Sequence, residues 1–417
     1  MSTLIYNINT LVHTEQSPKS RYLGKEMANL VCVNDAFLYI VDGKISDFGK
    51  SNPELIKSIK EKDPSLIMHD AENGHVFPSW VDAHTHIVFA GNRELEFENR
   101  IKGLSYEEIA LRGGGILNSA KALKDSSEDD LVASASRRLN EMKSLGTGAV
   151  EIKSGYGLSV ESELKMLRVI KRLKKESPLI IKATFLGAHA IPEEFKGRKK
   201  DYLQLLIKEV MPVIQQEGLA EFCDIFCEKN YFSSDDTLEL MEAAKNYGMT
   251  AKVHAEQLSH SGGIAAGIKS GAISVDHLEF ASDEDILELR NSETMPVLLP
   301  GAQLFLGLQN PPARKMIDSG CSVALSTDFN PGSCPSGNMN QMVSLACILY
   351  KMTPAEVIIA ATSNSAYAME LENVVGSICR GKIANLFITP EISSYAFLPY
   401  SFGSNLVKKV FLKGVMQ

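Results

Sequence analysis

The chain has 417 residues, a length that suits two or three ordinary domains or one large barrel with an addition. Its 43 Lys and Arg residues against 51 Asp and Glu give a net charge of −8 with no basic block, which argues against nucleic-acid binding. Neither a long apolar stretch nor a basic-then-apolar leader is present, which argues against membrane-spanning and secreted classes. The seven cysteines are odd in number and scattered, so we expect a soluble cytoplasmic protein.

Both ends of the chain contain sequence patterns typical of short β-strands. Near the amino end, two apolar runs flank Asp42 and Gly43, a pattern typical of a tight hairpin. Near the carboxyl end, residues 383–389 and 407–412 are β-rich runs separated by Gly and Pro. We therefore predict that residues 1–75 and 376–417 meet and form one small composite β-sandwich domain.

The middle of the chain, residues 76–375, alternates between apolar runs and amphipathic stretches such as 161–176, where leucine and isoleucine recur at helical spacing. Near-continuous apolar strands separated by helices predict a parallel sheet covered on both faces. Eight strands in this pattern predict an α/β fold, a metal-dependent (β/α)8 TIM barrel that serves as the catalytic domain. An open doubly wound sheet is the alternative, but it requires a glycine-rich fingerprint that the sequence lacks. The eight runs are 76–83, 147–153, 179–187, 222–228, 250–256, 273–280, 295–300 and 322–328.

Five of the nine histidines lie at the carboxyl ends of these predicted strands, where a barrel builds its active site. His84 and His86 alternate along one strand, so both side chains point the same way. The other three are His189, His254 and His277, and Asp328 ends the eighth run. Imidazoles and a carboxylate that converge on one mouth suit a divalent, zinc-like ion, so we predict a metal site. The remaining histidines lie in polar or terminal surroundings and are predicted to be at the surface; they are His13, His69, His75 and His260.

Taken in order, these strand-end residues resemble the amidohydrolase superfamily. The tail 376–386 resembles the superfamily's returning strand, although Asn385 stands where an acid is usual. Five short segments resemble signatures of the imidazolonepropionase family within it, and they lie at 90–93, 151–158, 185–189, 254–257 and 326–333.

The resemblance implies hydrolysis of the ring C–N bond of 4-imidazolone-5-propanoate to N-formimino-L-glutamate, a step of histidine degradation. It also implies a homodimer and one zinc or iron ion per chain, held by His84, His86, His254 and Asp328. The residues that it places in contact with substrate or product are Arg93, Tyr106, Tyr156, His189, Gln257, Asn330, Gly332 and Ser333.

Chemical reasoning assigns further roles to the same residues. A bound divalent ion makes hydroxide available near neutral pH, and Asp328 could carry the released proton to the leaving nitrogen. We group His277, which could stabilise an oxyanion, and the hydrogen-bonding Gln257 with Asp328 as catalytic residues. Arg93 offers a bidentate fork for the propanoate.

Three alternatives remain open. A zinc-dependent nucleobase deaminase needs an acid three residues after His254, where the chain has Gln257, although Glu256 lies beside it. A two-metal cyclic amidase needs a bridging lysine at the end of the fourth strand, whereas Lys153 ends the second. A non-catalytic scaffold of the same fold would have lost metal ligands that are all present here.

Overall fold

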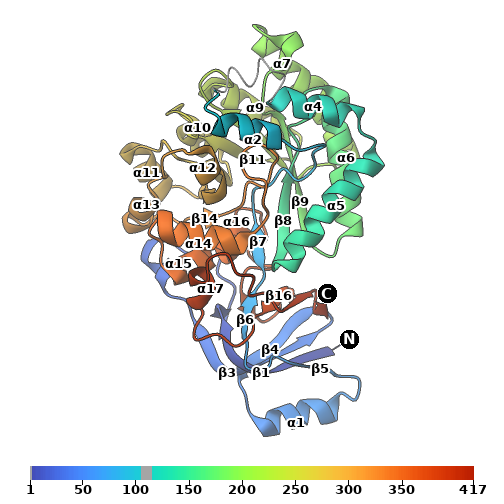
Figure 1. Cartoon of the computed structure of the whole chain (residues 1–417), viewed down its shortest axis with the longest axis vertical. Coiled ribbons are helices and arrows are strands. Elements are labelled where there is room, and N and C mark those ends of the chain that lie inside the picture. Colours follow the sequence, from blue (N-terminus) through green and yellow to red (C-terminus); the bar gives the residue numbers. More distant parts are fainter. Residues whose placement is uncertain (1, 105–114) are drawn as a thin grey trace.

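The computed structural model describes residues 2–104 and 115–417 of the chain. Within those residues, eight parallel strands follow one another in chain order around a barrel (Figure 1). A parallel bridge between Thr85 and Phe329 joins the first strand's extension to the last, and the Asp328 amide donates to the His84 carbonyl at 3.0 Å. The sheet therefore closes, which confirms the predicted barrel. Its strands are β7 (Trp80–Asp82), β8 (Thr147–Lys153), β9 (Ile180–Ala188), β10 (Phe222–Cys227), β11 (Thr250–Ala255), β12 (Ser274–His277), β13 (Met295–Leu298) and β14 (Ala324–Leu325).

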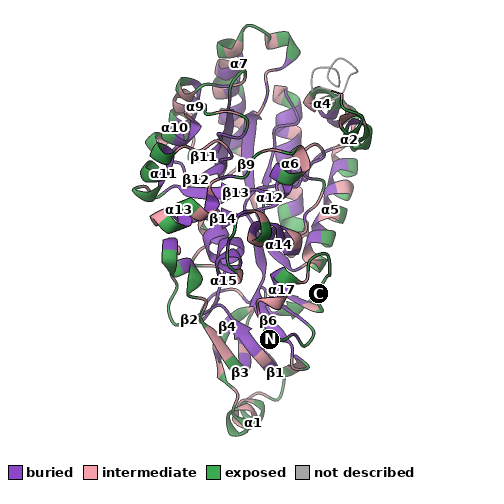
Figure 2. Cartoon of the chain, turned by 60° about the vertical axis from the view of Figure 1, so that its left-hand side comes forward, coloured by how far each residue is buried: buried purple, intermediate pink, exposed green. Residues whose placement is uncertain are grey.

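Helices cover the outside of the barrel and bury one face each against the strands, so buried residues form its interior (Figure 2). The amphipathic stretch at 161–176 forms α6 (Val160–Glu176), which begins after the capping Ser159. Capping boxes at Ser233 and Ser282 start two further helices in the same way. The helices that accompany the barrel are α2 (Glu94–Ile101), α4 (Ile116–Asp125), α5 (Glu128–Ser144), α7 (Lys199–Leu205), α8 (Met211–Glu217), α9 (Ser234–Asn246), α10 (Gly263–Ser270), α11 (Asp283–Arg290), α12 (Pro300–Leu306), α13 (Ala313–Ser319), α14 (Met339–Leu349), α15 (Pro354–Ile359) and α16 (Ser365–Tyr367).

A second sheet is built from both ends of the chain and lies at one end of the barrel (Figure 1). Its hairpin turns at Asp42 and Gly43, both with positive φ, as predicted. The carboxyl-terminal strands pair with each other, and β16 also pairs with β6, so the two termini share one sheet. The strands of this sheet are β1 (Ser2–Val12), β3 (Cys32–Val41), β4 (Lys44–Lys50), β5 (Ile67–Asp70), β6 (His75–Pro78), β16 (Leu386–Ile388), β17 (Lys409–Leu412) and β18 (Val415–Met416).

Smaller elements complete the fold, namely a two-stranded piece of β2 (Thr14–Glu15) and β15 (Ile378–Cys379), with α1 (Pro53–Lys62) and α17 (Phe397–Tyr400). The first predicted strand, 76–83, is divided at Ser79 between β6 of this sheet and β7 of the barrel. No helix among the described residues is long and apolar enough to cross a membrane.

Two histidines predicted at the surface are buried instead. His13 and His75 are each 1% exposed, because both lie in or beside strands of the terminal sheet that pack into the molecule. His13 Nε2 lies 2.6 Å from the Ser363 hydroxyl, which gives its polar ring a partner inside the fold. The prediction was therefore wrong for these two, whereas His260 is exposed as expected.

Candidate active site

The barrel presents its polar side chains where the strands end. Three of the residues at these ends have left-handed backbone, with φ of 50° at Glu256, 90° at His277 and 55° at Asp328. Such conformations are costly for residues other than glycine and persist where the surrounding structure holds them. All three lie at the carboxyl ends of barrel strands, the end at which such barrels build their active sites.

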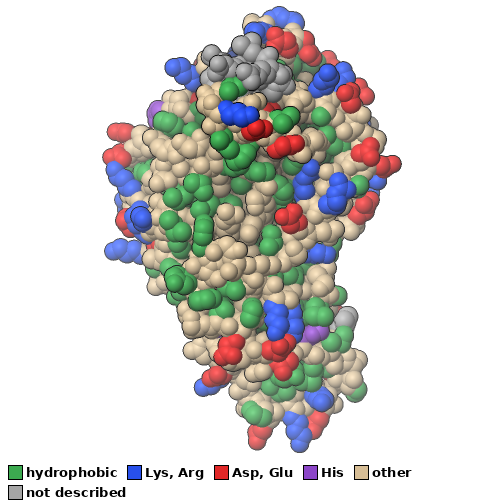
Figure 3. All heavy atoms as spheres, viewed as in Figure 1, with side chains coloured by type: hydrophobic (Ala, Val, Ile, Leu, Met, Phe, Trp, Pro, Cys, Tyr) green, Lys and Arg blue, Asp and Glu red, His purple; other side chains and the backbone are tan. Residues whose placement is uncertain are grey.

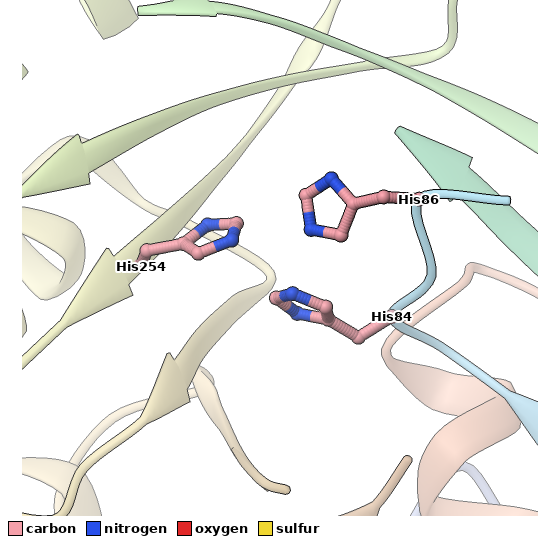
Figure 4. Close-up of side chains that lie close together, drawn as sticks. All are labelled: His84, His86 and His254. Carbon is pink, nitrogen blue, oxygen red and sulfur yellow. The ribbon is translucent and has the colours of Figure 1, made fainter. Parts of the chain in front are cut away.

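Three histidines converge there in the arrangement that a metal ion requires. His84 and His86 follow β7 and His254 lies on β11, and their rings turn toward one shared space (Figure 4). One ligand atom from each lies within 4.8 Å of the others. Asp328 Oδ1 is 3.6 Å from His84 Nε2 and 3.5 Å from His86 Nε2, so the carboxylate faces the same space.

The protonation of these histidines suits metal binding. Burial, reinforced by Lys153 for His84 and by His189 for His86, holds the pKa of both rings well below their usual range, so both rings are neutral, the form in which imidazole binds a metal. His84 Nδ1 is 2.6 Å from Asp276 Oδ2, while the buried Nε2 has no hydrogen-bond partner among the described residues. A buried nitrogen without a partner is costly, and a metal ion would satisfy it. The donor set therefore fits a divalent transition metal.

His277 and Asp328 lie beside the histidine group. The His277 ring centroid is 5.4 Å from that of His84 and 5.2 Å from that of His254. Burial lowers the pKa of His277, but the nearby carboxylates of Glu279 and Asp328 outweigh it and raise the pKa above the ordinary value. Burial raises the pKa of Asp328, whose Oδ2 accepts a hydrogen bond from the Ser333 hydroxyl at 2.9 Å.

A cavity of about 460 Å³ opens in front of these groups, a size typical of small-molecule sites. It brings together most of the residues singled out from the sequence. His84 does not line the cavity, and Tyr106 lies outside the described residues. The singled-out residues that line it are His86, Arg93, Tyr156, His189, His254, Gln257, His277, Asp328, Asn330, Gly332 and Ser333.

Two arginines of the cavity wall meet at Gly332. Arg93 packs so closely on this glycine that a Cβ there would lie 2.3 Å from its Nη1. Arg100 on α2 donates from Nη2 to the Gly332 carbonyl at 3.0 Å. Glu96 pairs with Arg93 through Nε at 2.8 Å, and no described carboxylate forms an ion pair with Arg100. Among the described residues, this part of the wall therefore has two arginines and one carboxylate, a net charge of +1.

His189 is a neutral hydrogen-bonding group in the cavity wall. Burial, assisted by His254, lowers its pKa to about 3. Its Nδ1 donates to the Gly155 carbonyl at 3.1 Å, which leaves Nε2 as an acceptor. The ring stacks on His86 with centroids 5.3 Å apart and an interplanar angle of 15°.

The side chain of Asn330 shapes the loop after β14. Its Oδ1 accepts hydrogen bonds from the amides of Gly332 and Ser333, both at 2.8 Å, and its Nδ2 donates to the Asp328 carbonyl at 2.7 Å. These bonds form an Asx-type turn that holds Ser333 against Asp328. Asn330 therefore organises the loop whether or not it also contacts a ligand.

Gln257 and Glu256 are adjacent but have different environments. Gln257 lines the cavity. The Glu256 carboxylate accepts hydrogen bonds from the amides of Gly263 at 2.8 Å and Ile264 at 2.9 Å, so it caps the start of α10. Glu256 is thus committed to the helix, and Gln257 is the neighbour available to a ligand.

Sequence reasoning missed Arg100 and Glu96, which both line the cavity. They lie on α2, in the long segment after β7, where no strand end or motif marks them. Their one signal is the spacing of Arg93, Glu96 and Arg100, which places the three on adjacent turns of a helix.

Comparisons with known proteins agree with this geometry. Residues 75–416 match the amidohydrolase family. An imidazolonepropionase of Christiangramia forsetii is 52% identical over 416 residues, which make up 99% of this chain and 99% of that protein. An imidazolonepropionase of Streptococcus pyogenes serotype M12 is 40% identical over 396 residues, 94% of this chain and 92% of the relative.

Solved structures with the same fold include two guanine deaminases. The E. coli enzyme matches with a TM-score of 0.75 at 13% identity, covering 100% of this chain and 99% of that one. The enzyme from C. acetobutylicum matches with a TM-score of 0.71 at 16% identity, covering 100% of both chains. At such identities the likeness concerns the fold alone, whereas the sequence relatives define the group. The chain therefore belongs to the amidohydrolase family and, within it, to the imidazolonepropionases.

Proposed function

We propose that the chain hydrolyses 4-imidazolone-5-propanoate to N-formimino-L-glutamate in histidine degradation. Water adds to the ring carbonyl carbon, the bond from this carbon to the adjacent ring nitrogen breaks, and that nitrogen takes up a proton. The observation that carries the proposal is one cavity whose wall includes His86, His254 and Asp328 together with the arginines Arg93 and Arg100. A ring with an anionic side chain has the matching polarity.

The metal-binding residues in this proposal are His84, His86, His254 and Asp328, and the ion is zinc or iron, one per chain. A bound divalent ion would lower the pKa of water to about 7 and so provide a nucleophile at neutral pH. Asp328 would accept the proton of the attacking water and deliver it to the leaving nitrogen. His277 would face the negative charge that develops on the carbonyl oxygen.

Other residues of the wall would hold the substrate. The unprotonated Nε2 of His189 can accept a hydrogen bond from a ring N–H, because Nδ1 is committed to Gly155. Gln257 would bond the ring by its amide. Arg93 and Arg100 together would bind the propanoate, since carboxylates pair well with guanidinium groups.

Deamination of a nucleobase is the rival reaction, and the position of Glu256 disfavours it. A deaminase needs a carboxylic acid that faces the base. Glu256 caps α10 instead, and Gln257 in the cavity cannot transfer a proton. A homodimer and a cytoplasmic location stay predictions from the resemblance and the composition.

The direct test uses purified, metal-replete protein and freshly prepared 4-imidazolone-5-propanoate. We expect the ring's ultraviolet absorbance to disappear, N-formimino-L-glutamate to form in equal amount, and elemental analysis to find about one zinc or iron per chain. Guanine and cytosine serve as controls and should release no ammonia. If either base released ammonia while the imidazolone stayed unchanged, the assignment would be reversed in favour of a deaminase.

A further inference from the structure

A connected group of buried ion pairs lies inside the barrel beside the histidines. The Lys153 ammonium, at the carboxyl end of β8, lies 2.8 Å from Glu151 Oε1 and 2.7 Å from Asp224 Oδ2. It also lies 3.4 Å from Asp276 Oδ2. All four side chains are fully buried. A buried lysine this well paired needs a reason, because burying charges costs more than packing apolar groups in the same space.

The two aspartates connect this lysine to two of the three histidines. Asp276 Oδ2, which faces Lys153, is also 2.6 Å from His84 Nδ1. Asp224 Oδ2, the other oxygen at the ammonium, is 3.0 Å from His254 Nδ1 without forming a hydrogen bond to it, and Asp224 Oδ1 accepts a hydrogen bond from the His254 backbone amide at 3.2 Å. The Asp276 carboxylate at His84 Nδ1 fixes the proton there, leaves the Nε2 lone pair for a metal and fixes the orientation of the ring. Asp224 instead holds His254 through its backbone amide and faces its ring.

The charges of the group are almost balanced without a metal. Lys252 is the second buried ammonium, which pairs with Glu151 and donates to the Ala83 carbonyl at 3.2 Å, immediately before His84 in the chain. The buried carboxylates of this group are one more than its ammonium groups, which leaves one negative charge, and Asp328 adds another. The members are Glu151, Asp224 and Asp276 with Lys153 and Lys252. A divalent cation would neutralise both.

The ammonium of Lys153 keeps its proton in this setting. Burial by itself would lower its pKa, but the carboxylates of Asp224, Glu151 and Asp276 reverse this effect and raise the pKa above the ordinary lysine value. Lys153 therefore stays charged at neutral pH and keeps its ion pairs.

We propose that Lys153 is a positioning residue for the metal site. Its ammonium ties Asp224 to Asp276 and thereby holds His84 and His254 in the positions in which they could bind the ion. This inference rests on the metal-binding part of the proposed function. It adds a residue that contacts neither the ion nor the substrate.

A purely electrostatic role for Lys153 has the opposite sign, which makes the inference testable. A cation fixed near the site repels a metal ion, so its removal by Lys153→Met would tighten metal binding if charge alone mattered. If the ammonium positions the histidines, the same substitution weakens binding despite the more negative site. Loss of an outer partner of metal ligands typically weakens metal affinity by about 10–100-fold.

The experiment measures the zinc affinity of metal-free protein by competition with a chromophoric chelator. Wild-type protein, Lys153→Met and Lys382→Met are compared, and each is also loaded with cobalt(II) to record the visible absorption that reports ligand geometry. Lys382 is the matched control, because it is 1% exposed and pairs with Glu15 and Ser377 away from the metal site. Thermal unfolding of each metal-free protein measures the general loss of stability.

We expect Lys153→Met to lose at least 10-fold in zinc affinity and to alter the cobalt spectrum, whereas Lys382→Met loses stability alone. Unchanged or tighter zinc binding by Lys153→Met would overturn the inference, as would an equal loss in Lys382→Met. If Lys153→Met does not fold, Lys153→Gln replaces it and is judged by the same outcomes. Wild-type protein that binds no zinc or iron would instead refute the proposed function itself.

Discussion

Arg100 offers the cleanest test of how the cavity binds an anion. Arg93 is the more obvious candidate, but its removal would also leave Glu96, which is 9% exposed, without its cationic partner. An uncompensated buried carboxylate destabilises the fold, so the effect of Arg93→Ala would mix binding with stability. Arg100 has no such partner among the described residues. Arg100→Ala therefore removes one positive charge from the cavity and leaves none of the described carboxylates without an ion-pair partner.

The size of the effect follows from the environment of Arg100. A hydrogen bond to a charged group contributes about 1.5–3 kcal/mol, and the partial exposure of this side chain favours the lower end. About 1.5 kcal/mol corresponds to roughly a 10-fold loss in kcat/KM, carried by KM because the arginine lies away from the bond that breaks.

The assay compares two substrates and two variants. Arg100→Ala should raise KM for 4-imidazolone-5-propanoate about 10-fold and leave an analogue with an uncharged side chain almost unaffected. Arg168→Ala is the control, since Arg168 pairs with Glu217 through its guanidinium on the outside of the barrel. The reasoning is refuted if Arg100→Ala leaves KM unchanged, or if the charged and uncharged substrates lose equally.

Three further substitutions test other parts of the structure. Asp328→Asn removes the group that would carry the proton, so turnover should fall at least about 100-fold while far-ultraviolet circular dichroism stays native; near-normal turnover would exclude that role. Gly332→Ala places a Cβ 2.3 Å from Arg93 Nη1, so KM for the propanoate should rise, and a crystal structure with Arg93 undisturbed would contradict this. Burial lowers the pKa of His13 from 6.5 to about 4, because its effect exceeds the opposing effect of the Glu15 carboxylate. Between these two pH values the unfolded chain therefore binds a proton at His13 and the folded chain does not. The free energy of unfolding should therefore drop by about 3 kcal/mol between pH 7 and pH 4, and urea titrations of His13→Gln should show a drop smaller by that amount.

The sequence predicts the barrel well because the relevant signals are local. The strands are short buried runs, and several carry a polar residue at or next to the carboxyl end, such as Lys153 on β8 and His254 on β11. The pairing of His84 with His86 needs only alternation along one strand. The division at Ser79 was not visible, because β6 and β7 are both apolar and buried and differ only in the sheet they join. Such a choice depends on contacts with distant segments such as β16.

The errors and omissions at the site have the same physical origin. His13 has polar neighbours in sequence, yet its partner Ser363 comes from the opposite end of the chain. Arg100 follows a loop with no strand or glycine motif, so nothing local connects it to Gly332. Lys153 ends a predicted strand, but its role depends on Asp224 and Asp276 from two other strands.

The net charge of −8 and the anionic substrate are compatible because recognition is local. On the face in Figure 3, acidic and basic side chains are interspersed, and salt screens exposed charges beyond about 8–10 Å. In the cavity wall, Asp328 faces the histidines, whereas Arg100 bonds the Gly332 carbonyl and forms an ion pair with none of the described carboxylates. A propanoate beside Asp328 would be repelled, and beside Arg100 it would be attracted. An anionic side chain held by Arg100 and repelled by Asp328 would therefore also orient the ring, so affinity and orientation would have one electrostatic cause.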